Sequence, residues 1–313
     1  MEIKKVLIVS DIKGWATDSM ANGIIKSLKG DFIFTKKYAD DLTVFDLEEY
    51  DIIYIMIPGY IDEKIDKRYY PKLRTTFHGG PAVEGQAHQI QLKYNPIKIS
   101  YVSKEVRDRV KKYKIGNMTW TPHGVNIDKF DSENELQGIK TFGFAGHARY
   151  LMPDDSQQEH RRGQWIIDAW KKLNFDLKVA GGMPQHPQHV IKFNNIYPNI
   201  DCQSYNRNDI IGFYKKIDCY LIPDLRSGGP MPALEAGSMN IPLITTNCGL
   251  LGDSFIHMKH GLLIDSYDQF TNAIKWMKNN PEESIQMGKN WGNYVRNNRS
   301  WKSVSNKWKD FLE

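Results

Sequence analysis

The chain of 313 residues is 41% hydrophobic and 25% charged, which is typical of a soluble globular protein with room for two domains of about 150 residues. Its net charge of +5 is too small to indicate nucleic-acid binding by itself, and its three cysteines form no CxxC pair that would indicate a disulfide framework or a zinc site. No stretch approaches the roughly 18 apolar residues that span a bilayer, and the opening MEIKKVLIVS is interrupted too soon for a signal peptide, so we expect a cytoplasmic protein without a transmembrane segment.

Short apolar runs alternate with stretches of helical period through the front part of the chain. Strands are predicted at KKVLIVS, DFIFT, DIIYIMI, LRTTF, IKISYV and MTWTP. Helices are predicted from Asp18 or Ser19 to Leu28 and over 103–113, each opening on a capping residue. Such a pattern is typical of a parallel sheet that is buried on both faces by crossover helices. The polar stretch DSENELQGIK at 131–140 then predicts a domain boundary.

The same pattern restarts after this boundary, with strands predicted at TFGFAG, DLKVAGG, DCYLIPD, IPLITT and GLLID. We therefore expect an α/β chain of two Rossmann-like, doubly wound lobes, residues 1–130 and 131–290, followed by a C-terminal helical segment, 291–313, that packs back on the front lobe. Ligands of such sheets bind beyond the carboxyl ends of the strands, so two lobes facing each other form a binding cleft. The buried face of the last helix is predicted at Trp301, Val304, Trp308 and Phe311.

The block DCYLIPDLRSGGPMPALEAGS holds the strongest functional signal. A buried strand ends at Pro223, and a helix is predicted from about Pro232 with Glu235 in its first turn. The free amides and positive dipole at such a helix start favour an anionic or hydroxyl-rich ligand, and Gly228 and Gly229 let it approach the main chain. The two oxygens of Glu235 suit a pair of vicinal hydroxyls, and the alternative is a glutamate that only stabilises the helix dipole.

This block resembles the donor site of the retaining family-four glycosyltransferases of GT-B fold, the group 1 glycosyl transferases, whose signature has two glutamates separated by seven residues. The resemblance implies that Glu235 binds the nucleotide ribose, so that Glu235→Ala abolishes donor binding and leaves the fold intact. It also implies that the amides of Gly228, Gly229 and Met231 meet the donor sugar and phosphate. Ser227 stands where the family has its first glutamate, which usually contacts the donor sugar.

Two further stretches, TFGFAGHAR and RRGQWIIDAW, resemble the elements with which this family neutralises the donor diphosphate. Arg162 stands at the place of the family's lysine, and His147 at the place of its arginine, with Arg149 two residues on. A guanidinium suits bidentate phosphate contact. The alternative is that these are solvated loop arginines, which applies to Arg161 more readily than to Arg162.

The front lobe shows weaker signals. Gly14 follows the first strand, where a phosphate or sugar comes close in dinucleotide-type crevices. His78 follows the strand LRTTF, resembling the family's strand-histidine element near the transferred sugar and acceptor, and a structural histidine is the alternative. The stretch 92–114 has eight Lys or Arg against two acidic residues. Its basic helix face is either solvated or docks a polyanionic acceptor or an anionic membrane surface.

These signals predict a glycosyltransferase that moves a hexosyl or pentosyl group from a UDP- or GDP-linked sugar to an acceptor hydroxyl, with the retention that the resemblance implies. His78, Arg149 and Arg162 are the predicted catalytic residues. No cofactor is expected, and no metal, since the sequence has no Asp-any-Asp triplet. The acceptor is left open between a glycan, a lipid-linked molecule and a polyanion such as DNA, and peripheral membrane contact is open as well.

Two other functions fit parts of the sequence. The basic front lobe suggests a glycosyltransferase that acts on hydroxylated bases in DNA, whose affinity for duplex DNA would fall steeply with salt. Ser227 suggests a non-catalytic protein of GT-B fold that binds nucleotide sugars without transferring them.

Overall fold

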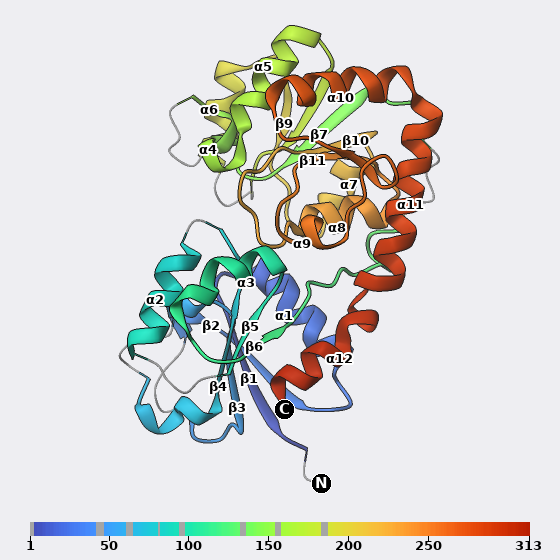
Figure 1. Cartoon of the computed structure of the whole chain (residues 1–313). Helices are drawn as coiled ribbons and strands as arrows, with labels where there is room; N and C mark the ends of the chain where they lie inside the picture. The colour runs from blue at the N-terminus through green and yellow to red at the C-terminus, as the bar shows by residue number, and fades with distance from the viewer. Residues whose placement is uncertain are drawn as a thin grey trace. The chain divides into compact units, whose positions relative to one another are not determined.

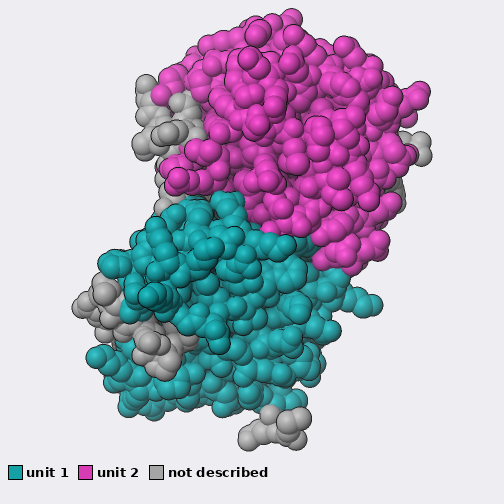
Figure 2. Space-filling view, in the orientation of Figure 1, with its two compact units in different colours: residues 1–124, 299–313 teal, residues 125–298 magenta. Residues whose placement is uncertain are grey.

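The computed structural model describes residues 3–41, 47–60, 65–80, 82–93, 98–131, 136–153, 158–182 and 187–313. The chain divides into two compact units, unit 1 with Met1–Gly124 and Arg299–Glu313 and unit 2 with Val125–Asn298 (Figure 2). Each unit contains a six-stranded parallel sheet, which confirms the predicted α/β class with two doubly wound sheets. Within the described ranges, no helix is both long and apolar enough to cross a membrane.

The sheet of unit 1 has the strand order β2-β1-β3-β4-β5-β6 (Figure 1). Its strands are β1 (Lys5–Ser10), β2 (Ile33–Tyr38), β3 (Ile52–Ile55), β4 (Leu73–Phe77), β5 (Lys98–Tyr101) and β6 (Met118–Trp120). Its α-helices are α1 (Ala16–Ser27), α2 (Val83–Lys93), α3 (Lys104–Val110) and α12 (Trp301–Leu312). Short 3-10 helices are η1 (Ala39–Asp41), η3 (Pro58–Tyr60), η4 (Lys67–Lys72) and η5 (Lys111–Tyr113).

Helices cover both faces of this sheet because its central strands are apolar on both sides. On one face, Ile53 of β3 lies in a core with Val83 of α2 and Val106 of α3. On the other face, the ring of Tyr54 packs against that of Trp308 in α12, with ring centres 5.9 Å apart. Successive residues of one strand thus serve two separate layers of helices.

The last helix, α12, packs within unit 1 although it ends the chain (Figure 1). Val304, Trp308 and Phe311, from its predicted apolar face, are at most 3% exposed, and Trp301 is half-buried. Gly124 makes room for this helix, because a Cβ there would lie 2.7 Å from the Trp301 ring. The indole of Trp308 also donates to a backbone carbonyl of the same unit at 2.9 Å.

Helix α1 begins earlier than the sequence indicates. The predicted start at residue 18 or 19 is wrong, because the helix begins at Ala16 after Trp15, which provides no side-chain cap. Asp18 has a different role: its carboxylate accepts the Gly14 N–H at 2.8 Å and pairs with Lys36 Nζ at 2.5 Å. This aspartate therefore fixes the turn after β1, in which Gly14 adopts a left-handed φ of 81°.

The sheet of unit 2 has the strand order β12-β11-β10-β7-β8-β9. Its strands are β7 (Thr141–Ala145), β8 (Asp176–Ala180), β9 (Asp201–Gln203), β10 (Cys219–Ile222), β11 (Leu243–Thr245) and β12 (Gly261–Leu263). Its helices are α4 (Gln158–Arg161), α5 (Gly163–Leu173), α6 (Gln188–Ile196), α7 (Ile210–Tyr214), α8 (Met231–Ser238), α9 (Gly249–Ser254), α10 (Tyr267–Asn279) and α11 (Pro281–Arg299), with the 3-10 helix η6 (Ala148–Leu151).

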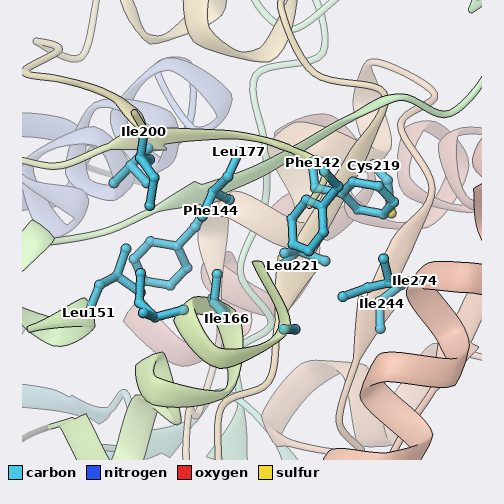
Figure 3. Packing of buried hydrophobic residues seen from close by; sticks show 14 of the residues in the cluster. Phe142, Phe144, Leu151, Ile166, Leu177, Ile200, Cys219, Leu221, Ile244 and Ile274 are labelled. Atoms are coloured by element: carbon cyan, nitrogen blue, oxygen red, sulfur yellow. The ribbon is translucent and has the colours of Figure 1, made fainter. Parts of the chain in front are cut away.

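The main core of unit 2 lies between one face of this sheet and helices α5, α6 and α10. Figure 3 shows Phe142 and Phe144 of β7 in one cluster with Ile166 of α5 and Ile274 of α10. The other face packs closely on the segment of α7, because a Cβ at Gly143 would lie 2.5 Å from Ile217. Helices on both faces leave the carboxyl edge of the sheet to loops, as the predicted site requires.

Candidate functional site

The sheet of unit 2 changes direction between β7 and β10, which pair directly although β8 and β9 come between them in sequence. Ligands of open parallel sheets bind beyond the carboxyl ends of the strands at such a switch point. All predicted site residues of this unit follow these two strands. The segment after β7 contains His147, Arg149 and Arg162, and the segment after β10 contains Ser227, Gly228, Gly229, Met231 and Glu235.

The loop 223–230 after β10 is held by backbone hydrogen bonds on two sides. Leu225 N donates to His160 O at 2.7 Å, and Leu250 N of α9 donates to Gly228 O at 3.0 Å. These two hydrogen bonds therefore hold the backbone of the loop in place. Of the residues predicted to meet the donor, Ser227, Gly228 and Met231 are buried and Gly229 is half-buried.

Glu235 is completely buried, at 0% exposure. Helix α8 begins at Met231, so Glu235 lies in its second turn, and the predicted position in the first turn is wrong. The macrodipole acts mainly on the first turn of a helix, which weakens the interpretation of Glu235 as a glutamate that only stabilises the dipole. A buried carboxylate instead requires specific partners.

Arg207 and Tyr214 are those partners, and sequence analysis missed both. Arg207 Nη2 pairs with Glu235 Oε1, and the Tyr214 hydroxyl donates to Glu235 Oε2 at 2.8 Å. The Glu235 charge raises the pKa of Arg207, which keeps the guanidinium charged. Burial raises the pKa of Tyr214 well above its usual value, so its hydroxyl remains a donor. The available signal was position, since Arg207 follows β9 at the same carboxyl edge of the sheet.

Arg161 forms another ion pair at this edge, with a buried carboxylate as its partner. Its Nη1 pairs with Oδ2 of Asp224, whose side chain is 2% exposed, while the Arg161 side chain is 38% exposed. The pair with Asp224 distinguishes Arg161 from a loop arginine that only contacts solvent. The Asp224 carboxylate raises the pKa of Arg161, so a permanent cation stands next to the loop after β10.

Arg162 points to a different neighbour. It precedes α5 with a left-handed φ of 47°, and its guanidinium lies 4.3 Å from the centre of the Trp165 ring. Trp165 in turn contacts Phe270 of α10, in the core on one face of the sheet. The next residue must be Gly163, because a Cβ there would lie 1.8 Å from Tyr150 O. The two adjacent arginines thus make separate contacts, one with Asp224 and one with an aromatic ring.

Three basic side chains contact the ring of Tyr150. The guanidinium carbons of Arg149 and Arg161 lie 5.2 and 5.4 Å from its centre, within cation–π range. His147 approaches the same ring edge-on, with ring centres 5.7 Å apart, and contacts His189 at 6.2 Å. The structure thus brings His147, Arg149 and Arg161 together beside the switch point.

Metal ligands do not gather at this edge. In the part of the chain that the structure describes, no group of three or more His, Cys, Asp or Glu side chains could hold a metal ion.

The model of the family "Glycosyl transferases group 1" matches residues 162–297, which include the loop after β10, Glu235, Arg207 and Tyr214. The chain is a GT-B glycosyltransferase. No curated protein sequence matches it.

Solved structures show the fold of this glycosyltransferase over its whole length. A glycosyltransferase from Rickettsia africae is 17% identical, with a TM-score of 0.71 over 100% of this chain and 98% of that one. Sucrose-phosphate synthase from Thermosynechococcus elongatus is 12% identical, with a TM-score of 0.78 over 98% of each chain. Anabaena Alr3699/HepE in complex with UDP is 11% identical, with a TM-score of 0.73 over 99% of each chain.

In unit 1 of the glycosyltransferase, His78 follows β4 and uses both ring nitrogens. Nε2 lies 2.9 Å from Met56 O, and Nδ1 lies 3.1 Å from His123 Nε2. A carbonyl only accepts, so Nε2 of His78 carries the hydrogen and Nδ1 accepts from His123. Burial lowers the pKa of His78 to about 4, so the ring is neutral at pH 7. His123, in the TPHGV stretch, was not predicted as its partner.

This low pKa predicts a stability loss in acid. The unfolded chain protonates His78 near pH 6.5, whereas the folded chain resists protonation until about pH 4. The contribution is therefore fully present above pH 6.5 and falls by ~1.4 kcal/mol per pH unit below it. Between pH 7 and pH 5, the unfolding free energy measured in urea should fall about 2 kcal/mol more for the native glycosyltransferase than for His78→Gln. Equal losses would contradict the assignment.

The basic stretch of unit 1 is partly neutralised by acidic residues within it and in α2. Arg107 and Lys111 both pair with Asp108, at 3.0 and 3.5 Å, and Arg109 pairs with Glu84 at 2.8 Å. Ser103 caps α3 as predicted. The docking of a polyanion or a membrane surface on this stretch stays a prediction, and residues 94–97 of it lie outside the described ranges.

Proposed function

We propose that this glycosyltransferase transfers a sugar from a nucleotide-diphosphate sugar to an acceptor hydroxyl, and that unit 2 binds the donor. The observation that carries the proposal is the fully buried Glu235 carboxylate, held by Arg207 and Tyr214 at the carboxyl edge of the sheet. Such a group suits the vicinal hydroxyls of a ribose. The cations around Tyr150 stand at the same edge and suit a diphosphate.

A uridine nucleotide is the donor that we propose. Anabaena Alr3699/HepE, whose fold this chain shares, has been solved with UDP and with UDP-glucose. A GDP-linked sugar is the alternative that sequence analysis left open. Ser227, buried next to Gly228, is the residue that we assign to the donor sugar.

The chemistry proposed for this edge is stabilisation of the leaving group. The bond between the anomeric carbon and the diphosphate oxygen breaks, the acceptor oxygen bonds to that carbon, and the hydroxyl proton is released. Negative charge grows on the departing diphosphate. We propose that this charge is stabilised by Arg161, Arg149 and His147 and by the amides of the loop after β10, which are already in position before the reaction. Retention of the anomeric configuration is what the family resemblance implies, and an NMR spectrum of the product would test it.

Gly14 and His78 belong to unit 1, to which we assign the acceptor. Gly14 leaves the backbone of the turn after β1 open to a close approach by a hydroxyl or phosphate. The neutral ring of His78 is held by hydrogen bonds with Met56 O and His123. We therefore propose that this ring lines the acceptor site in a fixed orientation.

A thermal-shift panel of nucleotide sugars tests the proposed function. A ligand at 100 times its Kd stabilises the folded state by about 2.7 kcal/mol, and this stabilisation produces a readily measured rise in Tm. We expect UDP and one UDP-linked sugar to raise Tm, and adenosine diphosphate to leave it unchanged. If neither the UDP-linked nor the GDP-linked sugars change Tm at millimolar concentration, the donor assignment fails.

Arg161 and Arg162 can be separated by their effect on phosphate binding. We propose that Arg161 is the arginine next to the diphosphate, because it pairs with Asp224 beside the loop after β10. Arg162 instead stacks against the ring of Trp165. In Arg161→Gln, the preference for UDP over uridine should fall about 10- to 100-fold, the value of a lost hydrogen bond to a charged group. In Arg162→Gln it should change less than about threefold. Calorimetric Kd values decide, and the opposite pattern would return the role to Arg162.

A further inference from the structure

Among the described residues, Arg207 and Tyr214 bond to the Glu235 carboxylate, and its oxygens have lone pairs for two more donors. Arg207 uses one acceptor position on Oε1, and Tyr214 uses one on Oε2. An ionised carboxylate offers about four lone-pair sites, two on each oxygen, so one remains on each. Two adjacent hydroxyls of one ring can donate to both oxygens at once.

The two partners of the Glu235 carboxylate differ in chemistry, because one is charged and the other is neutral. Arg207 supplies the charge without which a carboxylate at 0% exposure would be strongly disfavoured. Tyr214, itself fully buried, supplies a neutral donor with a fixed position. One guanidinium N–H on Oε1 and the phenol hydroxyl on Oε2 hold the two carboxylate oxygens separately, which restricts rotation of the carboxylate.

A second layer of contacts holds the partners themselves. Lys129 Nζ donates to the backbone carbonyl of Arg207. The ring of Phe130 meets that of Tyr214 edge-to-face, with centres 5.9 Å apart. Two adjacent residues of one segment thus support the two residues that hold Glu235.

We propose that Arg207 is a positioning residue for the nucleotide ribose, which, with Tyr214, holds the Glu235 carboxylate in the one orientation that accepts from both the 2′- and 3′-hydroxyls. This inference rests on the proposed donor function. It adds Arg207 to the donor site, although Arg207 lies outside the segments that resemble the family signature. Arg207 touches no substrate in this scheme and acts through Glu235.

The competing explanation is an ion pair that only stabilises unit 2. Such a pair would weaken all nucleotides equally when it is broken. A positioning role makes a narrower claim, because only the contact with the ribose diol depends on it. The ratio of the Kd for 2′-deoxy-UDP to the Kd for UDP is therefore the decisive quantity.

The experiment measures this ratio by calorimetry for the whole chain and for Arg207→Gln, Arg207→Lys and Tyr214→Phe. Lys178→Gln is the matched control, since it breaks the Lys178–Asp201 pair of β8 and β9 in the same unit. We expect the native chain to prefer UDP by about 10- to 100-fold, the value of a hydrogen bond to a charged group. Arg207→Gln should bring the ratio near one, Arg207→Lys and Tyr214→Phe should give intermediate ratios, and Lys178→Gln should keep the native ratio.

Each failure points to a different claim. A native ratio in Arg207→Gln overturns the positioning role and leaves the proposed function standing. A native chain that binds UDP and 2′-deoxy-UDP equally overturns the ribose contact of Glu235 as well. A native chain that prefers GDP moves the test to GDP and 2′-deoxy-GDP, where the same ratios decide. Binding of neither nucleotide overturns the donor function itself. If Arg207→Gln fails to fold, the ratios of Arg207→Lys and Tyr214→Phe settle the question, because both variants retain most of the packing.

Discussion

Replacement of Glu235 by alanine is expected to abolish the response to UDP and to lower the free energy of unfolding by about 3–5 kcal/mol. The first effect follows from loss of the ribose acceptor. The second arises because the Arg207 side chain, which is 25% exposed, would keep its charge without a counterion. The sequence alone suggested a variant with an intact fold, and the ion pair changes that expectation.

A double variant separates the two effects. Glu235→Leu combined with Arg207→Met replaces the pair by apolar side chains of similar volume, which is often neutral or stabilising for buried ion pairs. We expect its unfolding free energy in urea to recover toward the native value while UDP binding remains absent. Glu84→Ala, which breaks the Arg109–Glu84 pair of unit 1, is the control and should keep native UDP affinity. Native UDP affinity in Glu235→Ala would refute the role of this carboxylate.

The fold could be predicted because the strands are continuous apolar runs. VLIV in β1, IIYI in β3 and CYLI in β10 are almost entirely buried, as expected for a parallel sheet with helices on both faces. Alternation of such runs with helical segments leaves few arrangements other than doubly wound sheets. Fold class therefore depends on features that a single sequence displays directly.

Helix starts were less accurate where capping residues serve other contacts. Aspartate is a common N-cap residue, yet Asp18 accepts a hydrogen bond from Gly14 N–H and pairs with Lys36. Helix α1 therefore begins ahead of it, at Ala16. The start of α8 at Met231 is one residue before the expected one. A shift of one residue is enough to move a glutamate from the first turn of a helix to the second.

The partners within the site could not be predicted because they depend on strand order in space. Arg207 and Glu235 are 28 residues apart, and Arg161 and Asp224 are 63 apart, and each pair meets only because β7, β9 and β10 end at one edge. The contact of Arg162 with Trp165 was different, since the two residues are only three apart in the sequence. That spacing was a usable signal against Arg162 as a free phosphate ligand.

Gly249→Ala is expected to displace the loop after β10 and to weaken UDP binding by at least about 10-fold, because small misplacements of binding groups are costly. Gly249 begins α9 with a left-handed φ of 53°, which costs a non-glycine residue about 1–2 kcal/mol. A Cβ there would lie 1.9 Å from Ser227 O and 2.4 Å from Gly228 O. Both are backbone atoms, so no side chain can move aside and the loop itself must shift. The hydrogen bond from Leu250 N to Gly228 O would then be lost.

Gly252→Ala in the same helix is the matched control for this variant. Gly252 has no left-handed φ, and the nearest atom to its Cβ would be a side-chain oxygen of Asn247 at 3.3 Å. Alanine there should leave UDP affinity unchanged and can add up to about 1 kcal/mol of helix stability. Urea unfolding and calorimetry on both variants distinguish a clash at one glycine from a general effect of alanine in α9. If Gly249→Ala matches Gly252→Ala in both measurements, the loop after β10 does not depend on the start of α9, and a fixed loop backbone is not part of the donor site.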